Sequence, residues 1–341
     1  MGLAGIFVLA GLAVTGFGTV NGWAQRISFA IATGPSSGTY FPVGETIAGL
    51  ISHPPGMDRC SKPATCGPEG LIATAQTSPG AYANVLAVNT GRVDSALAQS
   101  DVVAQAVAGQ GAFKKKQSDI RTIATLFPED IHLLASAKSK IHTLADLRRK
   151  RVSVGALNSG TAVTAHAVLS AAGLLTGRRN AIKASNDSAD IAAQKIQAGQ
   201  IDAFFFVGGA PVPLVEALVS SGQAILVPID GSVRDKLIAE GHGLAADRIA
   251  ASTYGTAHAV ETVSVQAVWI VNDQESADVV YGLTRALFNA SNRTLLNQGP
   301  HSARLITLAG ATQNIAAPLH PGASRFYREA GASDKYTIRP R

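Results

Sequence analysis

The sequence predicts an α/β fold in two lobes, each built on a mixed sheet flanked by helices, with a ligand cleft between the lobes. One observation is a pattern that occurs twice. Residues 31–39 and 152–161 each carry a strand into a Ser/Gly/Thr turn that opens a helix, and Gly-x-Val/Ile-Asp follows further on, at residues 91–94 and 199–202. The second is composition, because 46% hydrophobic and 15% charged residues in a chain of 341 give a large core and favour two domains over one.

The two Ser/Gly/Thr turns are the candidate binding elements. A helix start presents free backbone N–H groups and the positive end of the helix dipole, and both attract an anion. Either turn alone could be an ordinary N-cap with a permissive glycine. Because one turn occurs in each predicted lobe, the pair favours a ligand held between them.

The first predicted lobe begins with alternating residues 27–31, which indicate a strand. Apolar residues at helical spacing over 43–51 then predict a helix whose first turn tolerates Pro42. The first copy of the pattern is longer than the second, and we interpret the Pro/Cys-rich residues 54–68 as an insertion. Further along, the pattern predicts a strand over 71–76, a helix over 82–89 and a strand over 94–99 that ends in the polar tip 99–101.

The second predicted lobe begins near Ile131. Residues 143–146 have the pattern of a capping box and start a short helix before a strand at 152–154. The next expected elements are a helix from 162 to about 173, a strand over 182–185, a helix over 190–198 and an apolar strand over 203–207. Small residues follow that last strand, at the sheet edge where open α/β folds bind ligands.

A long alternating strand at 263–271, which includes Trp269 as a core residue, is the best candidate for the return to the first lobe, and helices follow it. We therefore predict one lobe from residues 25–128 plus 262–341 and the other from 129–261. Glu129 and Asp130 lie at the first crossover. Adjacent residues of an extended segment point to opposite faces, which argues against paired acid–base catalysis and favours a hinge or solvated loop.

Residues 1–25 contain no charged side chain and are rich in Leu, Ala, Val and Gly. Small residues precede a possible cleavage site after Ala24, so residues 1–24 are predicted to be a signal peptide and the mature protein to be periplasmic. The basic start typical of a signal is missing, and an uncleaved membrane anchor is the alternative. In an exported chain the two cysteines, Cys60 and Cys66, favour a disulfide over a metal site, and no metal site is predicted.

The net charge of +6 does not by itself indicate a nucleic-acid partner. The basic residues are scattered, with short runs only at 114–116 and 148–151, and aromatic residues make up 6% of the chain. No nucleic-acid partner is expected.

Six short motifs occur in order along nearly all of the mature chain, at residues 33–42, 99–101, 146–161, 199–203, 319–323 and 326–331. As an ordered set they resemble the TAXI-type solute-binding proteins of tripartite ATP-independent periplasmic (TRAP) transporters. The resemblance implies a type II periplasmic-binding-protein fold that closes on a small organic anion, such as glutamate, 2-oxoglutarate or a related carboxylate. It further implies delivery to the membrane subunits of a TRAP transporter, without catalysis or a cofactor.

The resemblance also implies a set of ligand-binding residues: Ser36, Ser37, Thr39, Tyr40, Asn84, Gln99, Ser159, Gly160, Thr161 and Gly209. The chain departs from the family pattern over 78–84, where Gly-Ser-x-Glu-Asn would place an acidic residue at Ala83. The identity of the ligand is therefore left open.

Two other functions fit parts of the sequence. A periplasmic sensor or adaptor could use the same fold without transport. A serine hydrolase could use Ser36, because residues 34–38 match G-x-S-x-G and Asp273 with His301 or His320 lies downstream. The hydrolase is disfavoured since this turn follows the first strand of the mature chain and no His-Gly-Gly loop is present, and His320 is expected to order the C-terminal turn.

Overall fold

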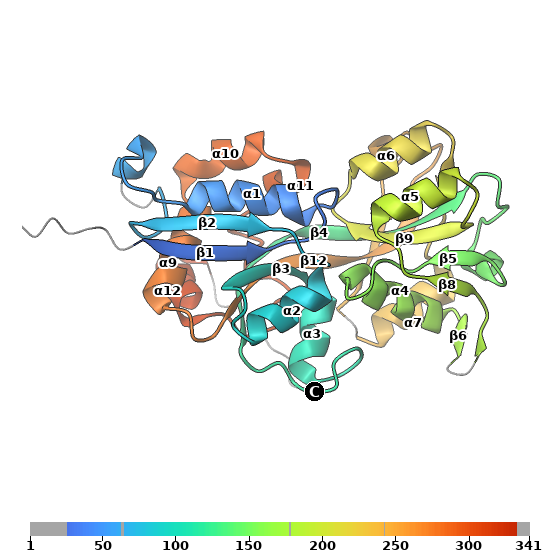
Figure 1. Cartoon of the computed structure of the whole chain (residues 1–341), viewed down its shortest axis with the longest axis horizontal. Coiled ribbons are helices and arrows are strands. Elements are labelled where there is room, and N and C mark those ends of the chain that lie inside the picture. The colour runs from blue at the N-terminus through green and yellow to red at the C-terminus, as the bar shows by residue number, and fades with distance from the viewer. Residues whose placement is uncertain (1–25, 63–64, 177–178, 242, 333–341) are drawn as a thin grey trace, which may run out of the picture.

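The computed structural model describes residues 26–62, 65–176, 179–241 and 243–332, and it has two lobes side by side along its longest axis (Figure 1). The predicted signal peptide, residues 1–24, lies outside the described residues. Within them, no helix combines the length and the apolar character that crossing a membrane requires.

The strands of both lobes form one continuous sheet. They are β1 (Ile27–Ala32), β2 (Leu71–Gln76), β3 (Ser95–Gln99), β4 (Ile120–Ser136), β5 (Arg151–Ser153), β8 (Lys183–Ser185), β9 (Ala203–Gly208), β10 (Ala224–Leu226), β11 (Ala245–Ile249) and β12 (Val260–Asn272), while β6 (Leu175–Thr176) and β7 (Arg179–Asn180) form a separate pair. The order is β2-β1-β3-β12-β4-β9-β5-β8, with β10 beside β4 and β11 beside β12. β1 pairs in parallel with β2 and β3, and β5 pairs in parallel with β8 and β9.

The antiparallel strands β4 and β12 join the two lobes. β4 pairs with β12 over its first part and with β9 over its second part, and β12 pairs with β3 in the first lobe and β11 in the second. The separate sheets that we predicted for the two lobes are therefore parts of one larger sheet. The predicted lobe boundaries, 128/129 and 261/262, fall inside β4 and β12 and stay a prediction.

Helices cover both faces of the sheet. They are α1 (Tyr40–Ile51), α2 (Ala81–Asn89), α3 (Ser100–Ala108), α4 (Gly160–Ala171), α5 (Ala189–Gln197), α6 (Pro213–Ser220), α7 (Gly231–Ala239), α8 (Ala251–Tyr254), α9 (Ala277–Leu287), α10 (Arg293–Gln298), α11 (His301–Arg304) and α12 (Pro321–Glu329), with 3-10 turns at Asp58–Ser61, Leu144–Leu147 and Ala290–Asn292. In Figure 1, α1 lies above the first lobe's strands with α2 and α3 below, and α5 and α6 lie above the second lobe's strands with α4 and α7 below.

Three hydrophobic clusters form the core. One fills the first lobe and contains Trp269, whose exposed fraction is 0% as the core prediction requires. The other two lie on opposite faces of the second lobe's sheet, because alternate residues of β9 point to opposite sides: Phe205 belongs to one cluster and Phe204 to the other. Each face of β9 is thus buried, which explains its continuous apolar sequence.

The strand predicted to end in polar residues 99–101 does end at Gln99, and these residues lead directly into α3, in which Val102, Val103 and Ala106 are buried. The solvated loop predicted as one alternative at Glu129 is wrong, because β4 continues through this position and pairs it with Val265 of β12, which leaves the Glu129 side chain 2% exposed. The other alternative, a hinge, stays a prediction.

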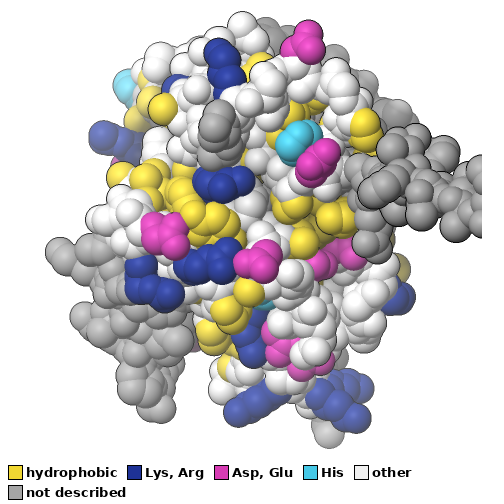
Figure 2. All heavy atoms as spheres, turned by 90° about the vertical axis from the view of Figure 1, so that its left-hand side faces the viewer, with side chains coloured by type: hydrophobic (Ala, Val, Ile, Leu, Met, Phe, Trp, Pro, Cys, Tyr) yellow, Lys and Arg dark blue, Asp and Glu magenta, His cyan; other side chains and the backbone are white. Residues whose placement is uncertain are grey.

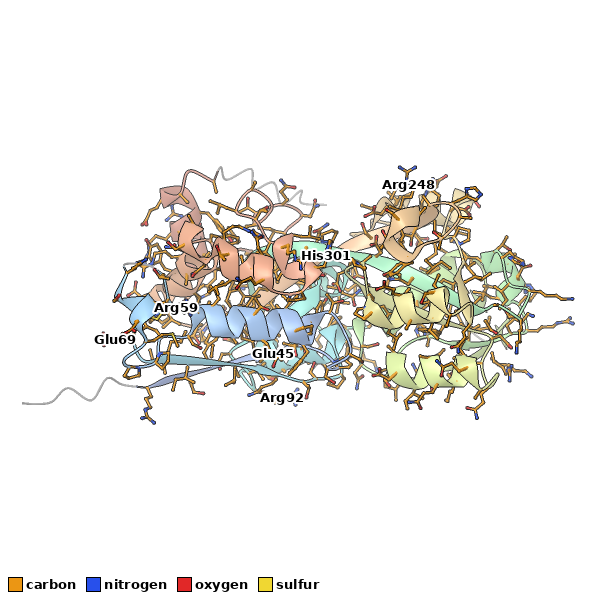
Figure 3. All side chains as sticks on the ribbon, turned by 90° about the horizontal axis from the view of Figure 1, so that it is seen from above. Glu45, Arg59, Glu69, Arg92, Arg248 and His301 are labelled. Carbon is orange, nitrogen blue, oxygen red and sulfur yellow. A yellow bond between two sulfur atoms is a disulfide. The ribbon has the colours of Figure 1, made fainter. Side chains whose placement is uncertain are left out.

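The disulfide predicted between Cys60 and Cys66 is present, with a Cα–Cα distance of 5.4 Å. Arg59 in the same loop donates to the carbonyl oxygens of Gly49 and Leu50 in the last turn of α1, at 2.6 and 2.7 Å. Figure 3 shows Arg59 at the outer end of the first lobe, so the inserted loop covers the end of α1 that is farther from the second lobe.

The outer face of the first lobe carries both signs of charge. Figure 2 shows Lys and Arg side chains interspersed with Asp and Glu, with hydrophobic side chains between them. The positive net charge is therefore not gathered into a uniform basic face at this end of the molecule.

Candidate functional site

A cavity of about 80 Å³ lies between the lobes, where strand ends meet helix starts. β1, β3 and β5 end at its wall, and the helices that follow the strands begin there. The N-cap residues of five helices line it: Thr39 of α1, Gly80 of α2, Gln99 of α3, Ser159 of α4 and Ser188 of α5. Because one water needs at least about 10–15 Å³ by this measure, the closed cavity holds on the order of six waters or a compact small molecule.

Positive potential in this cavity comes from the backbone. Each helix start carries unpaired N–H groups and roughly half a positive charge. Of the five N-cap residues, only Ser159 caps its own helix with its side chain, by accepting from the Ala162 N–H at 3.1 Å. The described residues that line the cavity include no Lys, Arg or His. The arrangement therefore suits an anion bound through backbone N–H groups and hydroxyls.

Glu129 is the acidic side chain in the wall. The Tyr40 hydroxyl donates to its Oε2 at 2.6 Å, and the two side chains are 8% and 2% exposed, respectively. Burial raises the pKa of Glu129 to about 8, and Asp101 and Asp130 push it in the same direction, against the hydrogen bond from Tyr40. Burial, followed by the charge of Glu129, also raises the pKa of Tyr40 well above its usual value. At neutral pH the Glu129 carboxyl is mostly protonated.

Seven of the ten residues predicted to bind ligand line the cavity: Ser37, Thr39, Tyr40, Gln99, Ser159, Gly160 and Thr161. The structure does not bring the other three into the wall. Ser36 is exposed on the turn before α1. Asn84 is buried beneath the site, where its Nδ2 donates to the carbonyl oxygens of Thr33 and Leu97 at 2.6 and 2.7 Å. Gly209 lies beyond β9, against Phe127 and Ser302.

Five of the seven residues have side-chain partners within the protein. The Ser37 and Tyr40 hydroxyls donate to carboxylates and Gln99 donates to Thr164. The Ser159 hydroxyl donates to the Ala156 carbonyl at 2.7 Å in addition to capping α4. The Thr161 hydroxyl accepts from the Val207 N–H at 3.3 Å. The Ser159 hydroxyl is therefore used within the wall. The Thr161 hydroxyl keeps a proton that it can donate to a ligand, together with the backbone N–H groups beside it.

Other parts of the wall were not predicted from the sequence. They are Gly34, Pro35, Gly38, Pro79, Gly80, Ala81, Glu129, Gly155, Ala156, Ser188, Ala189, Phe205, Phe206 and Val207. Most belong to turns after parallel strands, and the rule that such turns meet at one sheet edge could have found them. Nothing in the local sequence separates Glu129 from a surface carboxylate, since its burial depends on long-range strand pairing.

Contacts between the lobes close the cavity. The Ser37 hydroxyl of the first lobe donates to Asp190 Oδ2 of the second at 2.5 Å. Gln99 Nε2 donates to the Thr164 hydroxyl at 3.2 Å. The backbone of Gly160, in the second lobe, lies so near the Gln99 side chain of the first lobe that a Cβ added to Gly160 would fall 1.4 Å from Gln99 Oε1. The structure is thus the closed arrangement of the two lobes.

The hydrolase alternative gains no support from the geometry. Among the described residues, no histidine forms a hydrogen bond with Ser36. Asp273 pairs with Arg121 at 3.1 Å. His320 caps α12 by accepting from the Gly322 N–H and donates to the Glu275 carbonyl, so it orders the C-terminal turn as predicted. The part of the chain that the structure describes also contains no group of three His, Cys, Asp or Glu placed to hold a metal ion.

Comparisons with known proteins agree with the two-lobed fold. The sequence model of the NMT1-like family matches residues 31–331. The structure is similar to a binding protein component of an ABC phosphonate transporter from Pseudomonas aeruginosa, at 14% identity and a TM-score of 0.52, over 83% of this chain and 81% of that one. It is also similar to MatC from Rhodopseudomonas palustris with bound malate, at 13% identity and a TM-score of 0.52, over 89% and 96% of the chains. At such identities the likeness concerns the fold, and it confirms the predicted fold class.

Proposed function

Because the chain belongs to the NMT1-like family, we propose that it is an extracytoplasmic solute-binding protein that captures a small organic anion by closing its lobes. The observation that carries the proposal is the cavity at which five helices begin and whose described lining residues include no basic side chain. Such a site attracts negative charge through backbone groups that need no countercharge on a side chain.

The favoured ligand is a compact carboxylate such as malate, 2-oxoglutarate or glutamate. The cavity of about 80 Å³ has room for about six waters, which is close to the size of an acid of roughly ten non-hydrogen atoms and too small for a peptide or nucleotide. MatC, which shares the fold, is described with bound malate, and the TAXI-like motifs imply glutamate or 2-oxoglutarate. A phosphonate is the competing class, because the other similar structure belongs to a phosphonate transporter.

Capture would proceed by closure around the anion. The first lobe supplies the starts of α1, α2 and α3, and the second lobe supplies the starts of α4 and α5. A ligand that contacts both lobes binds the closed form more tightly than the open one, and it shifts the population by that difference. Following the motif resemblance, the closed protein would deliver its anion in the periplasm to the membrane subunits of a TRAP transporter.

A thermal-shift screen of residues 25–341 tests the proposal. The panel contains L-malate, 2-oxoglutarate, L-glutamate, methylphosphonate and glucose. We expect one or more carboxylates to raise the melting temperature, because a ligand at 100 times its Kd stabilises a folded protein by about 2.7 kcal/mol. The Ser36→Ala variant is the control and should respond like the wild type, since Ser36 lies outside the cavity wall.

Other results would contradict the proposal. A shift with methylphosphonate alone would replace the carboxylate by a phosphonate. No shift with any compound, together with hydrolysis of p-nitrophenyl acetate that Ser36→Ala abolishes, would overturn the binding function in favour of a hydrolase.

A further inference from the structure

A carboxyl group in the wall of an anion-binding cavity needs an explanation. Glu129 lines the cavity and is 2% exposed, at the edge where the helix starts converge. An ionised carboxylate there would repel a bound anion and would itself occupy the positive potential of the helices. A neutral carboxylic acid has the opposite effect, because its O–H group is a hydrogen-bond donor to an anion.

The contacts of Glu129 leave one of its oxygens available. Tyr40 donates to Oε2 at 2.6 Å. Among the described residues, none forms a hydrogen bond with Oε1. Because Oε2 accepts the hydrogen bond from Tyr40, a neutral Glu129 would carry its own proton on Oε1. Because the side chain lines the cavity, this O–H group can reach a ligand oxygen.

The groups around Glu129 favour the neutral form. Asp101 at the start of α3 disfavours a second negative charge. Asp130 on the same strand does so once it has ionised, since burial raises its own pKa to about 7. At the paired position, β12 presents the apolar Val265. Asp190 of α5, which is not part of the wall, accepts from the Ser37 hydroxyl. The Tyr40 hydroxyl, from α1, and the helix starts around the cavity favour the carboxylate, and burial of the side chain outweighs them.

We propose that Glu129 determines the ligand specificity of this cavity as a neutral acid, by donating a hydrogen bond from its carboxyl group to an oxygen of the bound anion. The inference rests on the proposed function and narrows it. An oxygen acceptor, as in the keto or hydroxyl-flanked carboxylates 2-oxoglutarate and malate, satisfies this donor. The ammonium group of an amino acid such as glutamate is itself a donor, so at the same place it could not accept the hydrogen bond from neutral Glu129. It would fit only if Glu129 lost its proton.

The pH dependence of binding follows from this role. Glu129 is neutral below its pKa of about 8. A bound anion should therefore have a constant Kd from pH 6 to about 7.5. Above the pKa, the anion must bind together with a proton, so the Kd should rise about tenfold per pH unit. A site that recognised an ammonium through an ionised Glu129 would show the reverse trend.

The test is calorimetric titration of residues 25–341 with 2-oxoglutarate, L-malate and L-glutamate at pH 6, 7, 8 and 9. For the wild type we expect the Kd of 2-oxoglutarate or malate to rise between pH 8 and 9. At pH 9, two buffers of different ionisation enthalpy should report uptake of about one proton per anion. Glu129→Gln keeps a neutral donor and should bind within about threefold of the wild type at pH 7, with a Kd that no longer depends on pH. Glu129→Ala should bind at least tenfold more weakly at pH 7.

A ligand-free measurement separates a folding defect from a binding defect. Without ligand, the melting temperature of Glu129→Gln minus that of the wild type should be larger at pH 8.5 than at pH 5. At the higher pH the folded wild type must either bury a charge at Glu129 or hold a proton that the unfolded chain releases, and the Gln variant does neither. If the wild type binds the anion with a Kd that does not depend on pH, the role proposed for Glu129 is wrong while the proposed binding function stands. Binding of glutamate only, lost in Glu129→Gln, overturns it in favour of a carboxylate that pairs an ammonium. Absence of binding by all three acids overturns the proposed function, and this inference with it.

Discussion

At the scale of single residues, burial decides what an ionisable side chain does. His132 is fully buried in β4, where its Nδ1 lies 3.0 Å from the Asp130 carbonyl and its Nε2 lies 2.9 Å from the Tyr254 hydroxyl. The Tyr254 hydroxyl accepts from the Val212 N–H, so its own proton is donated to Nε2. These partners fix a neutral imidazole that donates from Nδ1, and burial lowers its pKa to about 4.

We predict that His132 makes the fold sensitive to acid. Its folded pKa lies below the unfolded value of 6.5, so its contribution is complete above pH 6.5 and is lost as pH falls toward 4. The loss amounts to about 3 kcal/mol of unfolding free energy. His132→Asn should be less stable than the wild type at pH 7, with a difference that narrows by pH 4.

Urea denaturation at pH 7, 5.5 and 4 measures this. His301→Asn, at the exposed start of α11 (Figure 3), is the control and should follow the wild-type profile. A difference between His132→Asn and the wild type that stays constant with pH would contradict the prediction. Glu129 has a raised pKa, so its effect on the free energy of unfolding has the opposite sign: it lowers stability as the pH rises from 4.5 to 8. This effect is the same in the wild type and in His132→Asn, so it cancels in the difference between them.

At the scale of elements, helix α1 contributes to the cavity at its first turn and to stability, through the disulfide loop, at its last turn. Its first residue, Tyr40, lines the cavity, whereas its last turn is covered by the disulfide loop. Twelve helical residues span about 18 Å, so the loop is remote from the cavity. The helix can therefore be stabilised at one end without changing the chemistry at the other.

Removing the disulfide should lower stability and leave binding unchanged. For Cys60→Ser with Cys66→Ser we expect a decrease of roughly 2 kcal/mol in unfolding free energy, because the bridge closes a short loop. The Kd for the anion should stay within about twofold of the wild type. Denaturation and calorimetry measure the two quantities, and a tenfold change in Kd would show that the loop acts on the cavity.

At the scale of the whole molecule, closure depends on the fit between the lobes. Gly160 at the start of α4 meets Gln99 and Ala81 of the first lobe, and a Cβ there would fall 2.9 Å from the Ala81 Cβ. Gln99 is itself 3% exposed and donates to Thr164, so it has little room to move aside. The absence of a side chain at Gly160 is thus a condition for the closed form.

Gly160→Ala should keep the lobes apart. We expect the Kd for the anion to rise at least tenfold, with a larger radius of gyration in the presence of ligand, as measured by calorimetry and small-angle X-ray scattering. Gly49→Ala is the matched control, because a Cβ at that position of α1 meets nothing within 4 Å. Unchanged affinity in Gly160→Ala would mean that the closed contact does not matter for binding.

The sequence by itself determined the two-lobed α/β class, most strands and helices of the repeated pattern, the disulfide and seven residues of the cavity wall. The strands and helices follow from short-range information: apolar periodicity, N-cap residues and the Ser/Gly/Thr turns at strand ends. The disulfide follows from two nearby cysteines in a chain predicted to be exported, and the seven wall residues follow from the motif resemblance. Trp269 and His320 were predictable from short-range information as well, since an alternating strand and a residue before Pro321 have local signatures.

Only the tertiary structure decided which groups line the cavity. Ser159 and Thr161 use their hydroxyls within the protein, Ser36 lies outside the wall, and Asn84 lies beneath it. Glu129 became part of the wall because β4 pairs with β12 and runs on into the second lobe. A short sequence pattern encodes the start of a helix, but the burial and protonation of a side chain depend on residues more than a hundred positions away.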